Sequence, residues 1–257
     1  MIQQLLLDEE TDESRVSVPA VVPIPAEPPL IDGRLTEFVR RTLNSTFALI
    51  SLVLLSPVLL VLGILIRLES PGPIFYKGLR VGRNGRLFTM YKLRTLKVGA
   101  EKEIGLAFAR LDAPYATRLG RLLRQSKADE IPQLLNVMRG EMSLVGPRPV
   151  RPICAEHFSR RLPGYAEQFR VRPGITGLSQ MKAGDQAHAS LKLKYDLEYL
   201  GRRSIIMDLN ILAMTGAKIT GLQFRLLARK IGNLSGPATL SPQAGNGRAS
   251  QRQTANR

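Results

Sequence analysis

An uncharged run of twenty residues, FALISLVLLSPVLLVLGILI at positions 47–66, constrains this chain more than any other feature. Twenty residues in an α-helix span about 30 Å, which is the thickness of the hydrocarbon core of a bilayer. The N-terminus is acidic and has no early basic region, which argues against a cleaved signal peptide. The run therefore predicts a membrane-embedded helix, and a buried helix in a soluble core is the less favoured interpretation.

Two features of this helix favour a re-entrant path over a straight span. Ser56 and Pro57 lie at its centre, where proline removes an amide donor and bends the helix, and where the serine hydroxyl can bond a freed carbonyl. Basic flanks prefer the cytoplasmic side of the membrane. They occur both before the run (Arg34, Arg40, Arg41) and after it (Arg67, Lys77, Arg80, Arg83, Arg86). A re-entrant helix satisfies both flanks, and a straight span that tolerates the proline is the alternative.

Charge and cysteine content narrow the chemistry. The formal net charge is +16, but residues 1–30 hold six acidic residues against Arg15, a net −5 that leaves about +21 for the remainder. Such a surplus suits a polyanionic partner: nucleic acid, an anionic bilayer or a phosphorylated substrate. Cys154 is the only cysteine, so no intrachain disulfide forms, and two histidines far apart indicate no metal cluster.

The chain divides into four parts by composition. Residues 1–32 are acidic and then proline-rich, which predicts disorder. Residues 33–70 contain the membrane helix. Residues 71–230 carry the organised pattern of a folded domain, and residues 231–257 form a polar tail with little to bury, predicted to be disordered.

The organised part predicts an α+β fold that is mainly helical. Residues 73–78 and 86–95 are expected to pair as a short β-hairpin, because Asn84-Gly85 between them favours a tight turn. Helices are expected over 115–125 and over 131–139, the second ending at Gly140. A third, amphipathic helix over 205–230 either lies on the membrane surface or packs on the core. Its expected apolar face is Leu209, Leu212, Ala213 and Gly216.

The most informative short stretch is SKADEIPQLLNVMRGEMSLVGPRP at 126–149. Pro132 fits the first turn of a helix, so Asp129 and Glu130 are expected at its positive end, which keeps carboxylates ionised and attracts phosphate. An ionised carboxylate beside cations can attack phosphorus, and its neighbour can hold Mg²⁺. The structural alternative is that Ser126-x-x-Asp129 is a helix capping box.

Several cations accompany this acidic pair. Arg148 stands between two prolines in GPRP, where a stiff loop can present its guanidinium to phosphate as a bidentate fork. Lys92 and Arg94 are expected on one face of a strand, and Arg124 lies five residues before Asp129. Asp196 and Glu198 are acidic residues in a basic segment. The usual nucleotide-binding signatures are missing.

The order of these motifs resembles the bacterial sugar transferases known as monotopic phosphoglycosyl transferases, in their small form. The resemblance covers roughly residues 34–225. It rests on the Ser-Pro-interrupted helix, SPGPIFYKGLRVGRNGRLFTMYKLRT, DEIPQLLNVMRGEMSLVGPRP, RPGITGLSQ, KYDLEYL and SIIMDLNIL. The long second block is highly specific, unlike a lone short motif.

The resemblance implies a membrane-associated monotopic enzyme with a re-entrant helix on the cytoplasmic face of the bacterial inner membrane. Such enzymes transfer a sugar-1-phosphate from a UDP-sugar to undecaprenyl phosphate, release UMP, use Mg²⁺ and begin the lipid-linked assembly of surface glycans such as exopolysaccharide. The resemblance leaves a homo-oligomer open, and no nucleic-acid partner is expected.

The resemblance also assigns roles by position. Asp129 resembles the nucleophile that becomes an aspartyl-phosphosugar, and Glu130 resembles the Mg²⁺ ligand. Asp196 resembles a further acidic residue of the active site. Lys92, Arg94, Arg124 and Arg148 resemble the cluster around the substrate phosphates. Two residues depart from the family pattern, Ala128 where a larger apolar residue is usual and Ser179 where an aromatic is often found; the second puts sugar or membrane contacts in question.

Two other classes of function remain open on the sequence. A membrane-anchored nucleic-acid binder would explain the basic charge, but stacking aromatics are sparse and the Asp129–Glu130 pair would have no purpose. A non-catalytic scaffold of polysaccharide assembly would explain the anchor, but it would not need the acidic pair together with Arg124 and Arg148.

Overall fold

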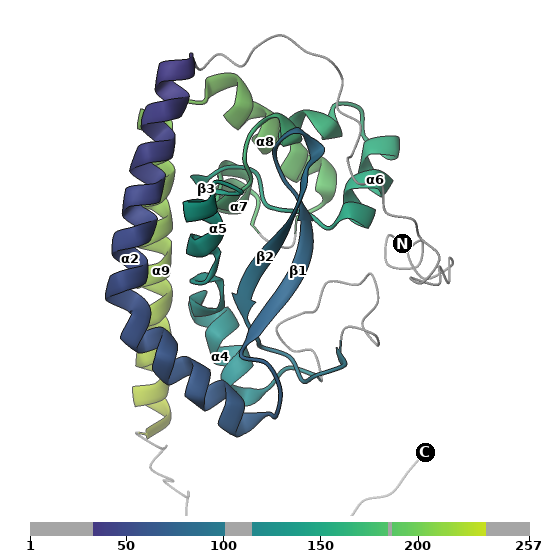
Figure 1. Ribbon diagram of the computed structural model, residues 1–257. Helices are drawn as coiled ribbons and strands as arrows, with labels where there is room; N and C mark the ends of the chain where they lie inside the picture. The colour runs from purple at the N-terminus through teal and green to yellow at the C-terminus, as the bar shows by residue number, and fades with distance from the viewer. Residues whose placement is uncertain (1–32, 101–114, 185–186, 235–257) are drawn as a thin grey trace, which may run out of the picture.

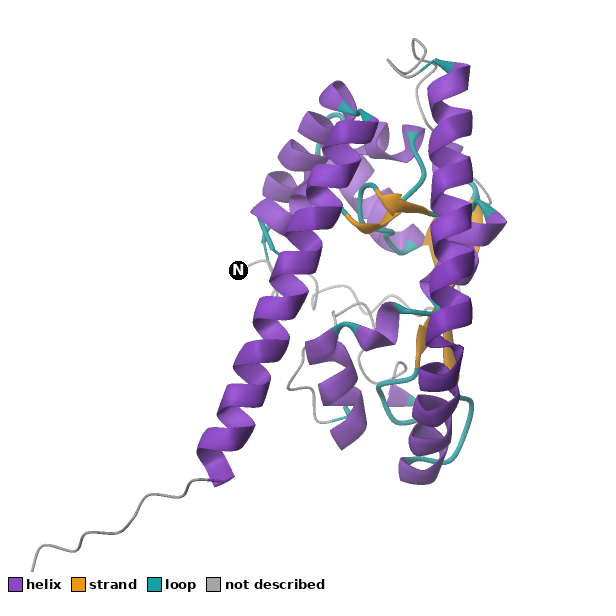
Figure 2. Ribbon diagram, turned by 90° about the vertical axis from the view of Figure 1, so that its left-hand side faces the viewer, coloured by secondary structure: helices purple, strands orange, loops and turns teal. Residues whose placement is uncertain are grey.

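The computed structural model describes residues 33–100, 115–184 and 187–234. Two long helices, α2 (Arg34–Glu69) and α9 (Ile205–Leu234), lie on one side of a domain built from shorter helices and two small sheets (Figure 1). In the perpendicular view the two helices diverge from one end to the other (Figure 2). The predicted α+β, mainly helical fold is confirmed. The acidic N-terminal segment and most of the predicted tail lie outside the described residues, and α9 continues to Leu234.

Helix α2 bends in its second half without being interrupted (Figure 1). Pro57 lies inside it and has no amide hydrogen to offer the carbonyl of Val53, four residues earlier. The hydroxyl of Ser56 donates to that carbonyl at 2.8 Å. Ser56 and Pro57 therefore produce the expected bend. The Val53 carbonyl that proline leaves without a donor is still hydrogen-bonded within the helix, as an apolar environment requires.

Most of the α2 surface is apolar and uncovered. Its mean hydropathy reaches 2.9, and among the described residues it is the one helix long and apolar enough to cross a membrane, by length and composition. Its buried residues are Arg40, Ala48, Gly63 and Ile66. A water-soluble domain does not leave an apolar helix exposed in this way, so the surface of α2 suits a lipid environment.

The N-terminal end of α2 is fixed to the domain by buried charges. The Nε of Arg40 donates to Oδ2 of Asp208 on α9 at 2.7 Å, and the hydroxyl of Tyr199 donates to Oδ1 of the same carboxylate at 2.7 Å. Nearby, the carboxylate of Glu37 accepts from arginines in four parts of the chain: Arg40, Arg83, Arg172 and Arg203.

The C-terminal end of α2 is fixed to the same domain. The Glu69 carboxylate accepts hydrogen bonds from the backbone amides of Arg118 and Leu119, at 2.7 and 3.0 Å. These amides open helix α4 (Arg118–Ser126), so Glu69 caps that helix from another element. The Arg94 guanidinium donates to the carbonyls of Ser70 and Pro71, just past the end of α2. Both ends of the apolar helix are therefore attached to one domain.

The expected β-hairpin is confirmed. Strand β1 (Phe75–Val81) pairs antiparallel with β2 (Leu87–Leu93), and Tyr76 faces Lys92 in the register. The turn η1 (Arg83–Gly85) has Asn84 and Gly85 in the left-handed region, at φ 55° and 73°. Asparagine and glycine tolerate this conformation best, which is why the pair predicted the turn.

The remaining elements surround this hairpin. The two predicted helices are α4, which begins three residues later than expected, and α5 (Gln133–Arg139), which ends at Gly140 with φ 76°. A short parallel pair of strands, unpredicted, joins distant segments. The other elements are η2 (Ala128–Glu130), β3 (Ser143–Val145), α6 (Pro152–Arg161), η3 (Tyr165–Arg170), β4 (Gly174–Thr176), α7 (Leu178–Lys182) and α8 (Ala189–Arg202).

The central core joins β2 and α5 to both long helices. Buried side chains from β2 (Phe88, Met90) and α5 (Leu134, Val137) pack with Ile211 of α9. Asn136 fixes α5 to β2 from within this core: its amide nitrogen donates to the Thr89 carbonyl at 2.7 Å, and its oxygen accepts from the Tyr91 amide at 3.1 Å. The start of α5 is thereby held against β2.

The expected apolar face of α9 is wrong for three of its four residues, and only Leu212 packs against the central core. Leu209 is 60% exposed, and Ala213 and Gly216 are exposed as well, whereas Asp208 and Ile211 are buried. An aspartate normally marks the solvent side of a helix, but here Arg40 neutralises it inside the protein, so the packed face is rotated toward Asp208. Ile206, Leu209 and Met214 are exposed apolar side chains of α9, which suits the membrane-surface alternative, although Asn210 and Lys218 are exposed as well.

Replacing Asp208 tests the N-terminal attachment of α2. Asp208→Asn leaves Arg40 buried without its charged partner, so the free energy of unfolding should fall by about 3 kcal/mol. Glu198→Gln, which removes a carboxylate from a more exposed pair with Lys182, should cost less than about 1 kcal/mol. Denaturant unfolding of detergent-solubilised protein measures both, and equal effects would show that the buried pair contributes nothing special.

Candidate active site

The acidic pair lies in the joint between α4 and α5. Lys127 ends α4 in the left-handed conformation, at φ 61°, and turns the chain into the 3₁₀ turn η2 that carries Asp129 and Glu130. Helix α5 begins only at Gln133, so Pro132 precedes it instead of occupying its first turn. The pair therefore sits two residues further from the helix than the sequence predicted.

The capping-box alternative is wrong. The hydroxyl of Ser126 donates backward to the carbonyls of Leu122 and Leu123 within α4, at 2.9 and 3.2 Å. Neither η2 nor α5 has a side-chain cap. Asp129 and Glu130 are only 6% and 8% exposed, which is rare for carboxylates and requires compensating charge.

That charge comes from three separate elements. Lys92, on β2, places Nζ 2.7 Å from Oε1 of Glu130 and 3.9 Å from Oδ2 of Asp129. Arg148, in the loop after β3, places Nη2 3.4 Å from the same Glu130 oxygen. Arg124, on α4, lies within the electrostatic field of Asp129, and its Nε donates to the Thr95 hydroxyl at 2.8 Å. The structure thus brings three of the four predicted phosphate-binding residues to the pair.

The two carboxylates differ in acidity. Burial alone would raise the pKa of Glu130, but Lys92, Arg148 and Lys127 overcome it and lower this pKa to about 2. Burial raises the pKa of Asp129, the negative charge of Glu130 adds to that, and Lys92, Lys127 and Arg124 only partly oppose it. The expectation was that the helix start favours ionisation of both carboxylates; only Glu130 has a lowered pKa, and neighbouring cations cause it.

Arg94, the fourth predicted cation, lies apart from this group. Strand β2 ends at Leu93, so the alternation that should have placed Lys92 and Arg94 on one face stops between them. The Arg94 guanidinium instead binds the carbonyls after α2, and burial lowers its pKa. Arg94 therefore holds the end of α2, and its hydrogen bonds do not involve the acidic pair.

The partners of Asp196 that the structure shows lie outside the acidic pair. Asp196 is buried on α8, where it accepts a hydrogen bond from Ser179 on α7 and adds to the rise in the pKa of Tyr165 that burial causes. Burial raises the pKa of Asp196 to about 7, and the Ser179 hydrogen bond and Lys192 oppose this shift. Its carboxyl therefore ties α7 to α8.

Lys127, a cation next to the acidic pair in the sequence, adds charge as expected and also shapes the joint. Two contributors escaped the sequence reasoning: Thr95 anchors Arg124, and Asn136 holds α5 on β2. Of these, only Asn136 carried a signal, because an asparagine within the apolar pattern LLNVM must find partners if it is buried. Asn136 is fully buried, and its side chain has three hydrogen-bond partners.

The donor set can be compared with what a metal needs. Within residues 33–100, 115–184 and 187–234, no group of three or more histidine, cysteine or acidic side chains forms a metal cluster. Mg²⁺ does not require one, because it is commonly bound through one or two carboxylates together with substrate phosphates and water. Asp129 and Glu130 therefore fit an Mg²⁺ ion that arrives with a phosphorylated substrate.

Comparison with known proteins gives a consistent result. The sequence profile described as bacterial sugar transferase matches residues 35–221. A UDP-N-acetylgalactosamine-undecaprenyl-phosphate N-acetylgalactosaminephosphotransferase of Aeromonas hydrophila is 36% identical over 189 residues, which are 72% of this chain and 44% of that protein. The chain thus spans less than half of this relative's length.

The alignment with this chain covers a larger share of two further relatives. A UDP-glucose:undecaprenyl-phosphate glucose-1-phosphate transferase of Caulobacter vibrioides is 39% identical over 181 residues, 68% of this chain and 67% of that protein. The exopolysaccharide production protein PSS of Rhizobium leguminosarum bv. phaseoli is 36% identical over 182 residues, 67% of this chain and 90% of that protein.

The raised pKa of Asp196 predicts a pH-dependent stability. Because its pKa in the folded chain, about 7, lies above the ordinary 3.8, the folded state binds this proton more tightly. The contribution is fully present below about pH 4 and is lost as the pH rises through 7, by up to about 1.4 kcal/mol per pH unit.

Asp196→Asn should remove this dependence. Between pH 5 and 7 the wild-type free energy of unfolding should fall by about 2 kcal/mol relative to the variant. Denaturant unfolding at a series of pH values measures this, with Glu198→Gln, more exposed on the same helix, as the control that should keep the wild-type slope. Parallel curves for wild type and Asp196→Asn would contradict the raised pKa.

Proposed function

The chain belongs to the bacterial sugar transferase family, and on that basis we propose that it transfers a sugar-1-phosphate from a UDP-sugar to undecaprenyl phosphate, releasing UMP. The relatives named above are undecaprenyl-phosphate sugar phosphotransferases and an exopolysaccharide production protein. The reaction is a membrane step of polysaccharide assembly. The observation that carries the proposal is the buried pair Asp129–Glu130, surrounded by cations from three elements.

The difference in acidity divides the roles. Nucleophilicity generally falls as the pKa of the attacking group falls. Asp129, whose pKa is raised, is therefore the better nucleophile, and Glu130, whose pKa is about 2, is a poor nucleophile with a permanent negative charge suited to a cation. Glu130, with Asp129 beside it, would hold Mg²⁺, which when bound neutralises phosphate oxygens.

The reaction then proceeds in two displacements. An oxygen of Asp129 attacks the phosphorus next to the sugar, the bond from that phosphorus to the bridging oxygen breaks, and UMP leaves with the electron pair. A phosphate oxygen of undecaprenyl phosphate next attacks the aspartyl-phosphosugar, and Asp129 leaves as a carboxylate. The product is the sugar linked to undecaprenyl diphosphate.

The cations act on the phosphates in both displacements. Lys92 and Arg148 already flank Glu130, and Arg124 is held by Thr95 near Asp129, so positive charge surrounds the place where the transferred phosphoryl group must lie. Such fixed charges stabilise the negative charge that develops on phosphate oxygens in the transition state. Arg94 and Asp196 contribute by holding the fold around the site.

The attachment of α2 supports a re-entrant topology on the cytoplasmic face of the inner membrane. Its N-terminal end is held through Glu37 and Arg40, and its C-terminal end through Glu69 and the loop bound by Arg94. A helix that crosses the bilayer would have to release one of these ends from the domain. A bent helix dipped into one leaflet keeps both.

Replacing the acidic pair tests the mechanism. Wild-type protein incubated with a UDP-sugar labelled in the sugar, without lipid acceptor, should retain label on the peptide that contains Asp129, as mass spectrometry would show. Asp129→Asn should lose labelling and transfer by at least about a thousandfold, because it has no nucleophile. Glu130→Gln should lose about a hundredfold, and raised Mg²⁺ should restore only part.

The control is Glu156→Gln, which removes a carboxylate from an ion pair on the surface of α6 and should label like wild type. Unfolding curves would verify that each variant is folded. Transfer by Asp129→Asn near the wild-type rate, or label on another peptide, would overturn the covalent mechanism.

Cysteine labelling tests the topology. In a Cys154→Ser background, Gly33→Cys before α2 and Gly201→Cys in α8 introduce thiols at exposed positions with open space around them. In intact cells a membrane-impermeant maleimide should leave both thiols unlabelled, and permeabilisation should expose both. Labelling of position 33 alone in intact cells would show that α2 spans the membrane.

A further inference from the structure

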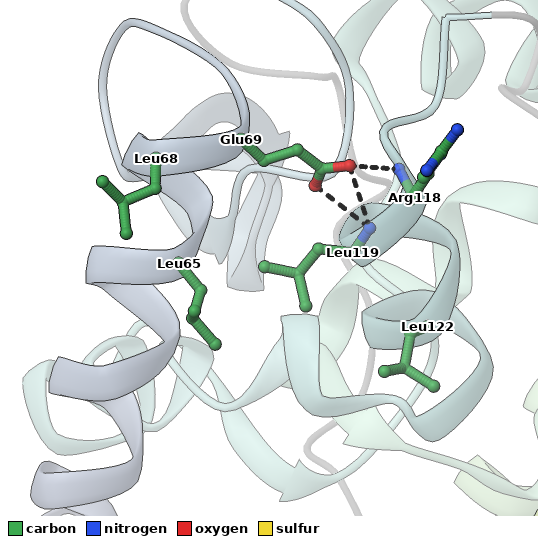
Figure 3. Close-up of a pocket in the computed structure, with 6 residues that line it drawn as sticks. All are labelled: Leu65, Leu68, Glu69, Arg118, Leu119 and Leu122. Atoms are coloured by element: carbon green, nitrogen blue, oxygen red, sulfur yellow. Dashed lines mark hydrogen bonds between the residues drawn. The ribbon is translucent and has the colours of Figure 1, made fainter.

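An open apolar groove lies between the C-terminal end of α2 and helix α4. Its volume is about 600 Å³, and it is lined by Leu65, Leu68 and Glu69 from α2 and by Arg118, Leu119 and Leu122 from α4 (Figure 3). The leucines on its two edges are left uncovered: Leu68 is 77% exposed and Leu122 is 53% exposed. Exposed leucines on two facing helices favour an apolar occupant.

Neither polar side chain of the groove is available to a ligand that lies on the leucines. The Glu69 carboxylate is used by the backbone amides that begin α4, and the Arg118 side chain points away from the leucines (Figure 3). A polar ligand would find no hydrogen-bonding partner among the leucines between them. The groove therefore suits a hydrocarbon chain.

Helix α4 leads from the groove to the turn that carries the acidic pair. Leu119 packs with Leu123 and Ile66 in a small apolar cluster that extends to Ala128, the residue before Asp129. On the same helix, Arg124 reaches toward Thr95 and the field of Asp129. Helix α4 thus presents leucines to the groove and an arginine to the acidic pair, about one turn apart.

We propose that this groove holds the polyprenyl chain of the lipid acceptor, in the isoprene units nearest its phosphate. The inference rests on the proposed function and adds the place where the acceptor enters. The acceptor phosphate must reach Asp129, and its chain must stay in apolar surroundings. The groove joins α2, the helix suited to lipid, to the helix that carries Arg124, so one molecule can satisfy both needs.

Photocrosslinking tests the occupant. The full chain, in vesicles of phosphatidylethanolamine and phosphatidylglycerol, is irradiated with a polyprenyl phosphate that carries a diazirine in its first isoprene units. Mass spectrometry should find the probe on the peptides that contain Leu65 and Leu68 or Leu119 and Leu122, and excess undecaprenyl phosphate should remove it. Probe on other elements, or a crosslink removed by added phospholipid and not by undecaprenyl phosphate, would overturn the proposal.

A kinetic variant tests the same groove independently. Leu122→Gln changes an exposed side chain, so the fold should survive, and KM for undecaprenyl phosphate should rise about tenfold, equivalent to about 1.4 kcal/mol. KM for the UDP-sugar and covalent labelling without acceptor should stay at wild-type values. Leu191→Gln, on an exposed position of α8, is the matched control and should leave every constant unchanged.

The outcomes separate the two proposals. If wild-type protein takes no label from the UDP-sugar, the proposed function fails. If labelling is normal but Leu122→Gln keeps the wild-type KM for undecaprenyl phosphate, only the groove assignment fails. If Leu122→Cys forms a disulfide-linked dimer in vesicles, the groove is covered by a second copy of the chain, and the assignment to the acceptor is wrong.

Discussion

The attachment of both ends of α2 to one domain is the constraint on which the rest of the structure depends. At one end Arg40 is buried against Asp208, and at the other Glu69 supplies the cap that begins α4. Because α4 leads directly into the turn that carries Asp129 and Glu130, the position of the apolar helix and the position of the acidic pair are set together. The proposed function, which pairs a water-soluble with a lipid substrate, would benefit from such a link.

The acidic pair shows how environment separates two neighbouring carboxylates. Both are buried, so both would lose their charge if burial acted alone. Lys92 and Arg148 contact Glu130 directly, and Lys92 is more than 1 Å further from Asp129. The separation in pKa therefore comes from which carboxylate the two cations contact, and the proposed division between nucleophile and metal ligand follows from that geometry.

Much of this could be predicted from the sequence because it depends on local patterns. The apolar run, the Ser56–Pro57 bend and the Asn84-Gly85 turn each follow from the residues within a few positions of them. The failures concern distant partners. Asp208 was not expected on the packed face of α9 because nothing nearby in sequence indicates Arg40, which lies 168 positions away. Arg94 was grouped with Lys92 because the end of the strand between them has no sequence signal.

The cations around the acidic pair do not explain which sugar the enzyme would select. The cations that surround the pair, Lys92, Arg124 and Arg148, suit phosphates, and the diphosphate is common to every UDP-sugar. Relatives with similar identity to this chain are named for N-acetylgalactosamine and for glucose. A cluster that binds the common part of the substrate does not distinguish these sugars. If the proposed function holds, selection of the sugar depends on side chains outside the phosphate cluster, which can differ without disturbing the acidic pair.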